Sequence, residues 1–533
     1  MAAHSDSGDE DALSRLLSQR MTYEAERAAL SARIRETDKN IAIIQAEYGA
    51  IYNKSSKLLR LPPEVTCMIF DHASGYPMEE EGEGEEFKAV HLLPEVVISH
   101  VCRHWREISL SYPRLWTSFS YDGPTSIRIP LERFDAYLKR SGTLDLELWI
   151  EFGYHSQGLE DDSSAKHLAL LEMAIDEAHR WKRTTLILNS ESAMLGTIMP
   201  KLQKVSVPRL EHFALCAEEE DLKEPSYLRN STVVNKVETT IFEGGASNLK
   251  SLRVDGKTYV TCTPPLSNLT ALRIESIINN PDSILSWTAF LSILELPSLQ
   301  DLSLIGDIFE PPTPEAMKII DMNNLKSLRY SDNDTVSLIL PCIRAPLLES
   351  LTLQSVWLPE ELGAMPMHPS EPYFFPSLHS LDLIDVTPST LHGAWYLVRM
   401  TRRAKDILLS HEDAGECVFV FTPAAYRSNP LFWPDMERLT LNMDATAEVG
   451  AFVHFFNCRP ATENRRKCIL RIFEHIKTNW QSQFEPLYYA LCDKCDIETV
   501  KLEDLAVGFW PPAEHPPDYF CEDADPFDIA NAY

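Results

Sequence analysis

Three short segments contain residues whose types and spacing could support chemistry. His100 and His104 are spaced as two metal ligands on one helix face, and Cys492 and Cys495 have the Cys-x-x-Cys spacing of half a zinc or redox site. Gly256-Lys257-Thr258 is similar to the end of a phosphate-binding loop. The chemistry to consider is therefore metal binding, thiol exchange and nucleotide binding.

Each of these segments is incomplete. The histidines have no third ligand placed nearby and the cysteines have no second pair, while the position at which a phosphate loop requires its first glycine is Ser251. The chain also has no Gly-x-Ser-x-Gly motif of a serine hydrolase. We therefore expect no metal, no cofactor and no catalytic residue, and we predict that the protein is not an enzyme.

Composition and charge indicate protein partners. The 533 residues carry a formal charge of −30 and are 44% hydrophobic, so the chain can build several cores but repels nucleic acid and anionic membrane. Most of the 11 cysteines are scattered singly, and no apolar run is long enough to cross a bilayer. The sequence predicts an intracellular protein of the cytoplasm or nucleus that binds neither nucleic acid nor membrane.

A long helix or coiled coil is predicted over residues 10–56. Apolar residues recur there at alternating spacings of three and four, the period of a coiled-coil seam, although Arg20, Arg27 and Thr37 occupy the other three seam positions. A single helix docked on its own chain would give the same pattern. We expect self-association, or the binding of a partner helix, through residues 13–51. The apolar seam residues are Leu13, Leu16, Tyr23, Leu30, Ile34, Ile41, Ile44, Tyr48 and Ile51.

A small all-helical domain is predicted over residues 58–121. One helix begins at the prolines of segment 61–70, because the first turn of a helix tolerates proline, and a second helix covers segment 98–106. The acidic residues 77–88 between them are expected to form a solvated loop. Apolar stripes at helical spacing consist of Val65, Ile69 and Phe70 on the first helix and Ile98, Val101, Cys102 and Trp105 on the second.

These segments resemble the F-box, in which Leu-Pro-x-Glu begins one helix and Val-Cys-x-x-Trp lies on the next. The following segment, 111–116, is similar to that of fungal F-box proteins with leucine-rich repeats. The resemblance implies docking on the S-phase kinase-associated adaptor protein, which in turn binds a cullin. The alternative is an ordinary helical hairpin packed on the rest of the chain. The resemblance assigns adaptor binding to Leu61, Pro62, Ile69, Val101, Cys102 and Trp105.

Residues 122–506 are predicted to form an α/β domain of repeated units. Three apolar residues, the second three positions and the third five positions after the first, recur in nine copies, many of them introduced by Pro or Asn. A unit of this length cannot bury its apolar face alone, so we expect an irregular leucine-rich-repeat solenoid with a parallel sheet. Residues 507–533, rich in proline and acid, are predicted to be a tail. The copies are Leu210/Phe213/Leu215, Leu249/Leu252/Val254, Leu269/Leu272/Ile274, Leu299/Leu302/Leu304, Leu325/Leu328/Tyr330, Leu348/Leu351/Leu353, Leu378/Leu381/Leu383, Met436/Leu439/Leu441 and Ile497/Val500/Leu502.

One face of this predicted sheet is expected to be basic. The residue between the last two apolar positions of a copy faces away from the core, and three of the first five such residues are Arg253, Arg273 and Arg329. Neighbouring strands lie about 4.8 Å apart, so Arg253 and Arg273 are expected to hold one carboxylate or phosphate together. Such a strip would bind acidic or phosphorylated target proteins. Alternatively, the arginines serve solubility, or nearby acidic loops neutralise them.

The resemblance and the repeats together predict the substrate-receptor subunit of an SCF-type cullin-RING ubiquitin ligase. The helical domain would bind the adaptor, and the repeats would hold a target beside the activated ubiquitin carrier. This raises the effective concentration of the target without a catalytic side chain in this chain. The alternative is a protein-interaction scaffold that uses the long helix and the repeats without any ligase.

Overall fold

The protein divides into two compact units, Met1–Tyr112 and Pro113–Tyr533. A computed structural model describes a defined set of residues in both, and the predicted acidic loop 77–88 lies outside that set. The predicted tail, residues 507–533, also lies outside it, apart from one residue. The described residues are 6–74, 93–123, 129–152, 163–188, 194–217, 232–276, 283–311, 318–331, 339–358, 374–388, 391–411, 433–443, 449–457, 459, 467–501, 505 and 527.

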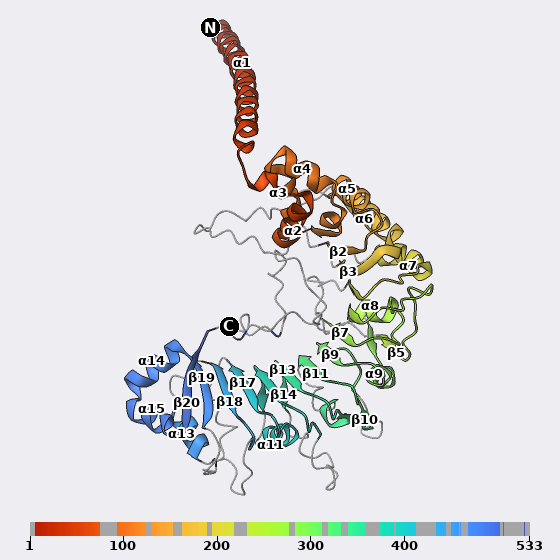
Figure 1. Ribbon diagram of the computed structural model, residues 1–533, viewed down its shortest axis with the longest axis vertical. Helices are drawn as coiled ribbons and strands as arrows, with labels where there is room; N and C mark the ends of the chain where they lie inside the picture. Colours follow the sequence, from red (N-terminus) through yellow and green to blue (C-terminus); the bar gives the residue numbers. More distant parts are fainter. Residues whose placement is uncertain are drawn as a thin grey trace, which may run out of the picture. The chain divides into compact units, whose positions relative to one another are not determined.

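The first unit is helical. Its longest element is α1 (Asp6–Asn53), an uninterrupted helix of 48 residues, which confirms the long helix predicted over residues 10–56 (Figure 1). No helix among the described residues combines the length and the apolar character needed to span a bilayer. Four shorter helices follow, namely η1 (Leu58–Arg60), α2 (Pro63–Ser74), α3 (Pro94–Val101) and α4 (Arg103–Leu110).

The second unit contains a 14-stranded parallel sheet in which the strands follow one another in space in the order of the sequence. This confirms the α/β class and the single parallel sheet that the repeated pattern predicts. The strands are β1 (Ser118–Asp122), β2 (Leu146–Glu151), β3 (Trp181–Ile187), β4 (His212–Cys216), β6 (Ser251–Asp255), β7 (Ala271–Glu275), β9 (Asp301–Ile305), β11 (Ser327–Ser331), β13 (Ser350–Gln354), β15 (Ser380–Ile384), β17 (Asp406–His411), β18 (Arg438–Met443), β19 (Cys468–Phe473) and β20 (Cys495–Val500).

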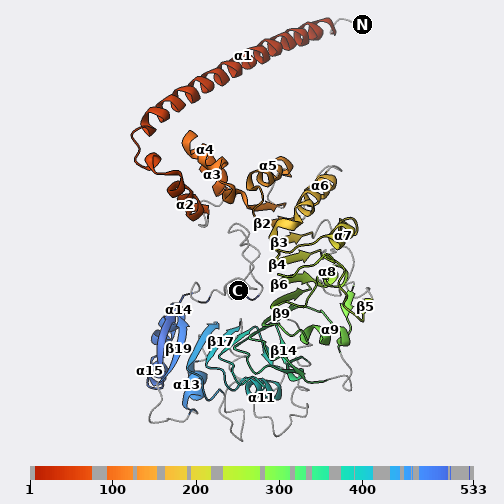
Figure 2. The same ribbon diagram turned by 45° about the vertical axis from the view of Figure 1, so that its right-hand side comes forward.

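Helices connect many of these strands, and Figure 2 shows α5 to α9 along the same face of the sheet. Three short strand pairs, β5 with β8, β10 with β12 and β14 with β16, lie outside the large sheet. The connecting elements are η2 (Pro113–Trp116), α5 (Leu131–Ser141), α6 (Ser163–Asp176), η3 (Ala178–Arg180), α7 (Leu195–Lys204), β5 (Thr232–Val234), α8 (Gly256–Thr261), β8 (Ser283–Leu285), α9 (Trp287–Leu294), β10 (Ile320–Asp321), η7 (Leu340–Cys342), β12 (Ile343–Arg344), β14 (Trp357–Leu358), β16 (Thr387–Pro388), α11 (Leu391–Met400), α13 (Val449–Asn457), α14 (Glu474–Gln483) and α15 (Glu485–Cys492).

The leucines of the repeated pattern form rows across the sheet. Leu252, Leu272 and Leu302 are partners in the strand register, and Leu328, Leu351 and Leu381 continue the row. All six are buried, and full burial of one such side chain contributes about 1.5–3 kcal/mol. Each leucine is therefore covered by the same residue of the neighbouring repeat, because a single strand offers it no core.

Asparagines before the first leucine of a copy join neighbouring repeats. Asn248 Nδ2 donates a hydrogen bond to the carbonyl oxygen of Pro208 at 2.7 Å, and Asn324 Nδ2 donates to that of Pro297 at 2.7 Å. Asn268 Nδ2 donates in the same way to Ser247 O at 3.0 Å. The asparagine in the pattern thus satisfies a carbonyl in the turn of the preceding repeat.

The boundary between the units lies before the end of the predicted helical domain. Although that domain was predicted to extend to residue 121, β1 already belongs to the sheet and pairs with β2. Phe119 of β1 packs on α5, with 4.4 Å between its ring centroid and that of Phe134 and 5.4 Å to that of Tyr137. These aromatic contacts assign the segment to the second unit.

Five described strands of the large sheet lie outside the nine copies of the pattern, and one copy has a different register. β1, β2 and β3 precede the first copy. β17 pairs between β15 and β18, and β19 pairs between β18 and β20. In β20, Ile497 aligns through Leu470 of β19 with Leu439, the second apolar residue of its copy. The last copy therefore starts three residues earlier than predicted. Among the strands that the structure describes, β20 pairs on one side only, so the pattern of its neighbours constrains it less.

Gly306 follows β9 in a conformation that only glycine adopts easily. Its φ is 77°, and an added Cβ would lie 2.0 Å from the carbonyl oxygen of Ser276. The Gly306 amide also donates to Ser331 O at 2.7 Å, which fixes the backbone between two repeats. The position leaves no room for a side chain.

We predict that Gly306→Ala lowers the free energy of unfolding by at least about 2 kcal/mol, because strain and a backbone clash add together. Gly196→Ala in α7 is the matched control, since an added Cβ there meets no atom within 4 Å. Urea unfolding followed by circular dichroism compares the two variants. Equal stabilities of the two variants would show that the close approach of Gly306 to the Ser276 carbonyl does not contribute to the stability of the fold.

Candidate functional site

The short helices of the first unit pack around an aromatic pair. Phe70 of α2 is fully buried, and its ring meets Trp105 of α4 edge to face, with 5.1 Å between ring centroids. The Tyr112 hydroxyl donates a hydrogen bond to Asp71 Oδ2 at 2.7 Å and ties the segment after α4 to α2. Trp105 is therefore part of the core of this unit.

The expected second helix is broken at Cys102. The backbone of Cys102 is extended, with φ −160° and ψ 168°, and its Sγ accepts a hydrogen bond from the backbone N of Trp105 at 3.4 Å. Cys102 thus caps the start of α4, whereas α3 ends at Val101. The prediction of one continuous helix over segment 98–106 is wrong, because the thiol satisfies an amide that has no partner within the helix.

The break also separates the two histidines. His100 belongs to α3, where its Nδ1 lies 2.7 Å from Val96 O, and His104 belongs to α4. They do not share a helix face, so the spacing that suggested two metal ligands has no counterpart in the fold. Among the residues that the structure describes, no group of three or more His, Cys, Asp or Glu side chains could hold a metal ion.

The six residues assigned to adaptor binding lie on or next to α2, α3 and α4. They differ in accessibility, and their role in binding remains a prediction. Val101 is 55% exposed and Pro62 is exposed, whereas Leu61, Ile69, Cys102 and Trp105 are half-buried.

Sequence reasoning missed the most exposed apolar residue of α2. Met68 is 69% exposed and Val65 is 40% exposed, and their spacing of three residues places them on neighbouring positions of one helix face. Phe70 and Thr66 are buried and lie four residues apart. The predicted stripe of Val65, Ile69 and Phe70 therefore needs correction, since Phe70 faces the core and Val65 faces solvent.

In the second unit, the arginines of the predicted basic strip occupy one row of the sheet. Arg253 of β6 is the register partner of Arg273 of β7. Ser303 of β9 separates Arg273 from Arg329 of β11. The row continues through Thr352. The adjacency that the sequence predicts for Arg253 and Arg273 is therefore present.

This arginine pair already holds a carboxylate of its own chain. Arg253 Nη2 lies 2.8 Å from Glu275 Oε1, and Arg273 Nε donates to Glu275 Oε2 at 2.7 Å. The three side chains are largely buried, at 18%, 7% and 8% exposure for Arg253, Arg273 and Glu275. Burial alone would raise the pKa of Glu275, but the two guanidinium groups lower it to about 2.

Sequence reasoning missed Glu275, although the signal was present. Glu275 follows Arg273 by two residues on the same strand, and side chains two apart share a face of a sheet. One alternative expected from the sequence is neutralisation by acidic loops; in the structure the neutralising carboxylate belongs to strand β7 and not to a loop. The role of Arg253 and Arg273 in target binding remains a prediction.

Arg329 has different surroundings. It is 3% exposed, and its guanidinium carbon lies 4.1 Å from the ring centroid of Phe527. Beyond its register partner Thr352 lies Asp382 of β15, whose Oδ2 accepts a hydrogen bond from Thr352 Oγ1 at 3.2 Å. Burial raises the pKa of Asp382 to about 6, although Thr352 and Arg329 oppose this shift.

The two other sequence motifs have structural roles. Asp255 caps α8 by accepting a hydrogen bond from the Thr258 amide at 2.7 Å, so Gly256-Lys257-Thr258 forms the first turn of a capped helix. Cys495 is buried in β20 as the register partner of Cys468, and its Sγ lies 3.4 Å from Leu491 O. Burial raises the pKa of the Cys495 thiol, which makes it a poor nucleophile.

No protein-family model matches the chain, and a search of curated proteins finds no significant match.

We predict that Glu275→Gln lowers the free energy of unfolding by about 3 kcal/mol at neutral pH, because two buried guanidinium groups lose their carboxylate. A folded-state pKa below the ordinary value of 4.5 stabilises the protein above pH 4.5, and this contribution disappears as the pH falls toward about 2. The difference between wild type and variant should therefore be smaller at about pH 3.5 than at about pH 7.

The control is Glu498→Gln in β20, where Glu498 is 51% exposed and its Oε2 lies 3.5 Å from Arg471 Nε. This substitution should change stability by less than about 1 kcal/mol. Urea titrations at both pH values provide the measurement. A Glu275→Gln protein as stable as the Glu498→Gln protein would contradict the conclusion that Glu275 neutralises the two buried arginines.

Proposed function

We propose that the chain is the substrate-receptor subunit of an SCF-type cullin-RING ubiquitin ligase. The observation that carries this proposal is the apolar surface of the helical unit, where Val65 and Met68 of α2 and Val101 of α3 are exposed next to the Leu-Pro-Pro-Glu and Val-Cys-x-x-Trp segments. Such side chains gain about 25 cal/mol per Å² when a partner covers them. We infer that this F-box-like face binds the S-phase kinase-associated adaptor protein.

We further propose that the second unit is an irregular leucine-rich-repeat solenoid that holds the target. Three features support this interpretation: one strand per repeat, a spatial order that follows the sequence, and aligned leucine rows. Asparagines that bond to the preceding repeat agree with stacked units. In this arrangement each repeat contacts mainly its neighbours, and the sheet offers an extended surface to a protein target.

The proposed mechanism is proximity. A target bound to the repeats would be held near the activated ubiquitin carrier that the adaptor and the cullin recruit. Holding two reactants together converts an encounter between molecules into a reaction within one complex, which raises the rate without chemistry in this chain.

We predict that Met68→Asp together with Val101→Asp weakens binding of the full chain to the adaptor by at least about tenfold, since both charges would enter an apolar interface. The two side chains are 69% and 55% exposed, so the substitutions should leave the fold intact. Trp105→Ala is a poorer test, because Trp105 packs on Phe70. Isothermal titration with purified adaptor measures the affinity.

Leu110→Asp is the matched control, because Leu110 is an apolar residue of α4 with 40% exposure. This variant should bind the adaptor like the wild type. Unchanged binding of the Met68→Asp, Val101→Asp variant, or absence of binding by the wild type, would favour a scaffold that works without the ligase.

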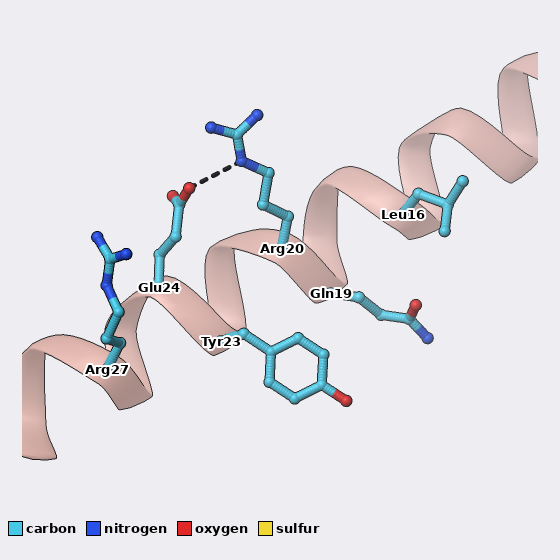
Figure 3. A pocket seen from close by; sticks show the side chains of 6 residues that line it. All are labelled: Leu16, Gln19, Arg20, Tyr23, Glu24 and Arg27. Carbon is cyan, nitrogen blue, oxygen red and sulfur yellow. Dashed lines mark hydrogen bonds and ion pairs between the residues drawn. The ribbon is translucent and has the colours of Figure 1, made fainter.

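The apolar side chains of α1 favour a second role in association. Leu13, Ile34 and Ile44 are between 60% and 64% exposed on a helix of 48 residues. In Figure 3, Arg20 reaches along the helix to Glu24, with Arg20 Nε 2.7 Å from Glu24 Oε1, while Leu16 and Tyr23 project from another side. Seam residue Arg20 is thus engaged within its own helix. We propose that α1 pairs with α1 of a second copy.

We predict that Arg20→Leu together with Arg27→Leu strengthens self-association of the full chain by at least about tenfold, because the seam becomes apolar at every position from Leu13 to Ile34. Arg15→Leu together with Arg33→Leu is the matched control, since these arginines lie on α1 outside the seam. Sedimentation equilibrium measures the dimer fraction. Wild-type and seam-variant chains that stay monomeric, or a control that associates equally, would contradict the proposal.

A further inference from the structure

A residue near the end of the chain is buried against the sheet. Phe527 is fully buried, and the guanidinium of Arg329 stacks over its ring at 4.1 Å from the centroid. Leu505 packs on Ile384 of β15 and Leu408 of β17. These are the two described residues beyond position 501, and both contact the same stretch of the sheet.

The contacts of Phe527 and Leu505 lie on the polar face of the sheet. Arg329 is one residue after Leu328, a member of the buried leucine row, and successive side chains point to opposite faces. Leu408 belongs to the same row as Arg329, through Thr352 and Asp382. Both residues near the end of the chain therefore pack on the face opposite the leucines.

Polar side chains on this face are buried as deeply as core residues. Ser303, Arg329 and Thr352 are 0%, 3% and 6% exposed. A single sheet cannot bury such residues on its polar face unless something covers that face. Leu505 and Phe527 are two described residues that contribute to this cover.

The sequence around Phe527 complements the charge of Arg329. After Lys501 the sequence contains no further lysine or arginine, and in the sequence Asp525 precedes Phe527 by two residues and Asp528 follows it directly. A guanidinium group is suited to this combination, since its plane stacks on an aromatic ring while its edges bind carboxylates.

We propose that the polar face of the sheet around Arg329 is a binding site for a peptide segment that carries an aromatic residue among carboxylates. The resident occupant of this site is Phe527, whose ring lies on Arg329. A protein target of the same chemistry binds only after it displaces Phe527, so Phe527 is an internal competitor that lowers the apparent affinity for targets.

The test uses a fluorescent peptide of residues 518–533 with Cys521→Ser and two full-length proteins, the wild type and Phe527→Ala. Loss of the internal competitor should make Phe527→Ala bind the peptide at least about tenfold more tightly than the wild type in fluorescence anisotropy. A peptide that itself carries Phe527→Ala should not bind. Equal affinities of the two proteins, or no binding to either, would overturn the proposal.

Arginine variants in the Phe527→Ala background test the site itself. Arg329→Lys keeps the charge but loses the planar stack, so peptide binding should weaken by about tenfold. Arg471→Lys is the matched control, because Arg471 of β19 lies in the same row, aligned with Thr440, and it should leave the affinity unchanged. Weakening of equal size in both variants would show non-specific charge attraction and contradict the site.

A second readout requires no substitution of Arg329. Phenylglyoxal modifies accessible arginines, and mass spectrometry locates the products. Arg329 should react faster in full-length Phe527→Ala than in the wild type. An unchanged rate would contradict the claim that Phe527 shields Arg329 from solvent. Both experiments use the purified chain without the adaptor, so their failure would leave the proposed ligase role untouched.

Discussion

The register of the strands is the constraint on which the second unit depends. Side chains alternate between the two faces of a strand, so a shift by one residue would turn the leucines away from the core and the arginines into it. The backbone partners Leu252, Leu272 and Leu302 are aligned, and Arg253 is therefore aligned with Arg273. Burial of leucine on one face thus decides which polar residues become neighbours on the other.

Close neighbours of like charge in turn require a counter-charge. Removing an ion from water costs several kcal/mol, and two buried guanidinium groups side by side would add mutual repulsion. Glu275 offsets both because it lies on the same strand and face as Arg273 and contacts both arginines. The low pKa of Glu275 reflects that neutralisation. The charges of the pair are consequently balanced within the sheet.

Much of the fold could be predicted from the apolar pattern, because the pattern records the side chains that must be buried. β17 was missed because its first apolar position is Ala404, which is fully buried but too small to mark a leucine repeat. The break at Cys102 was missed because residues on both sides have helical spacing, and only the capping bond from its thiol shows the end. The position of the arginine pair could be predicted, but its binding to a carboxylate of the same chain could not. The importance of Glu275 is visible only once Arg253 and Arg273 are known to contact it.

The net charge of −30 affects the approach of a partner differently from the contact that the partner finally makes. At physiological salt the field of a distant charge is screened within about 8 Å, so the acidic surface opposes acidic partners only weakly at a distance. At contact, a buried guanidinium dominates, because a low local dielectric strengthens its interactions. Arg329 stacks on an aromatic ring there. A planar and weakly hydrated guanidinium is stabilised by such a ring, whereas the strongly hydrated ammonium of a lysine would have to give up bound water. An overall acidic protein can therefore hold an acidic and aromatic segment, provided that the contact is made on this one face.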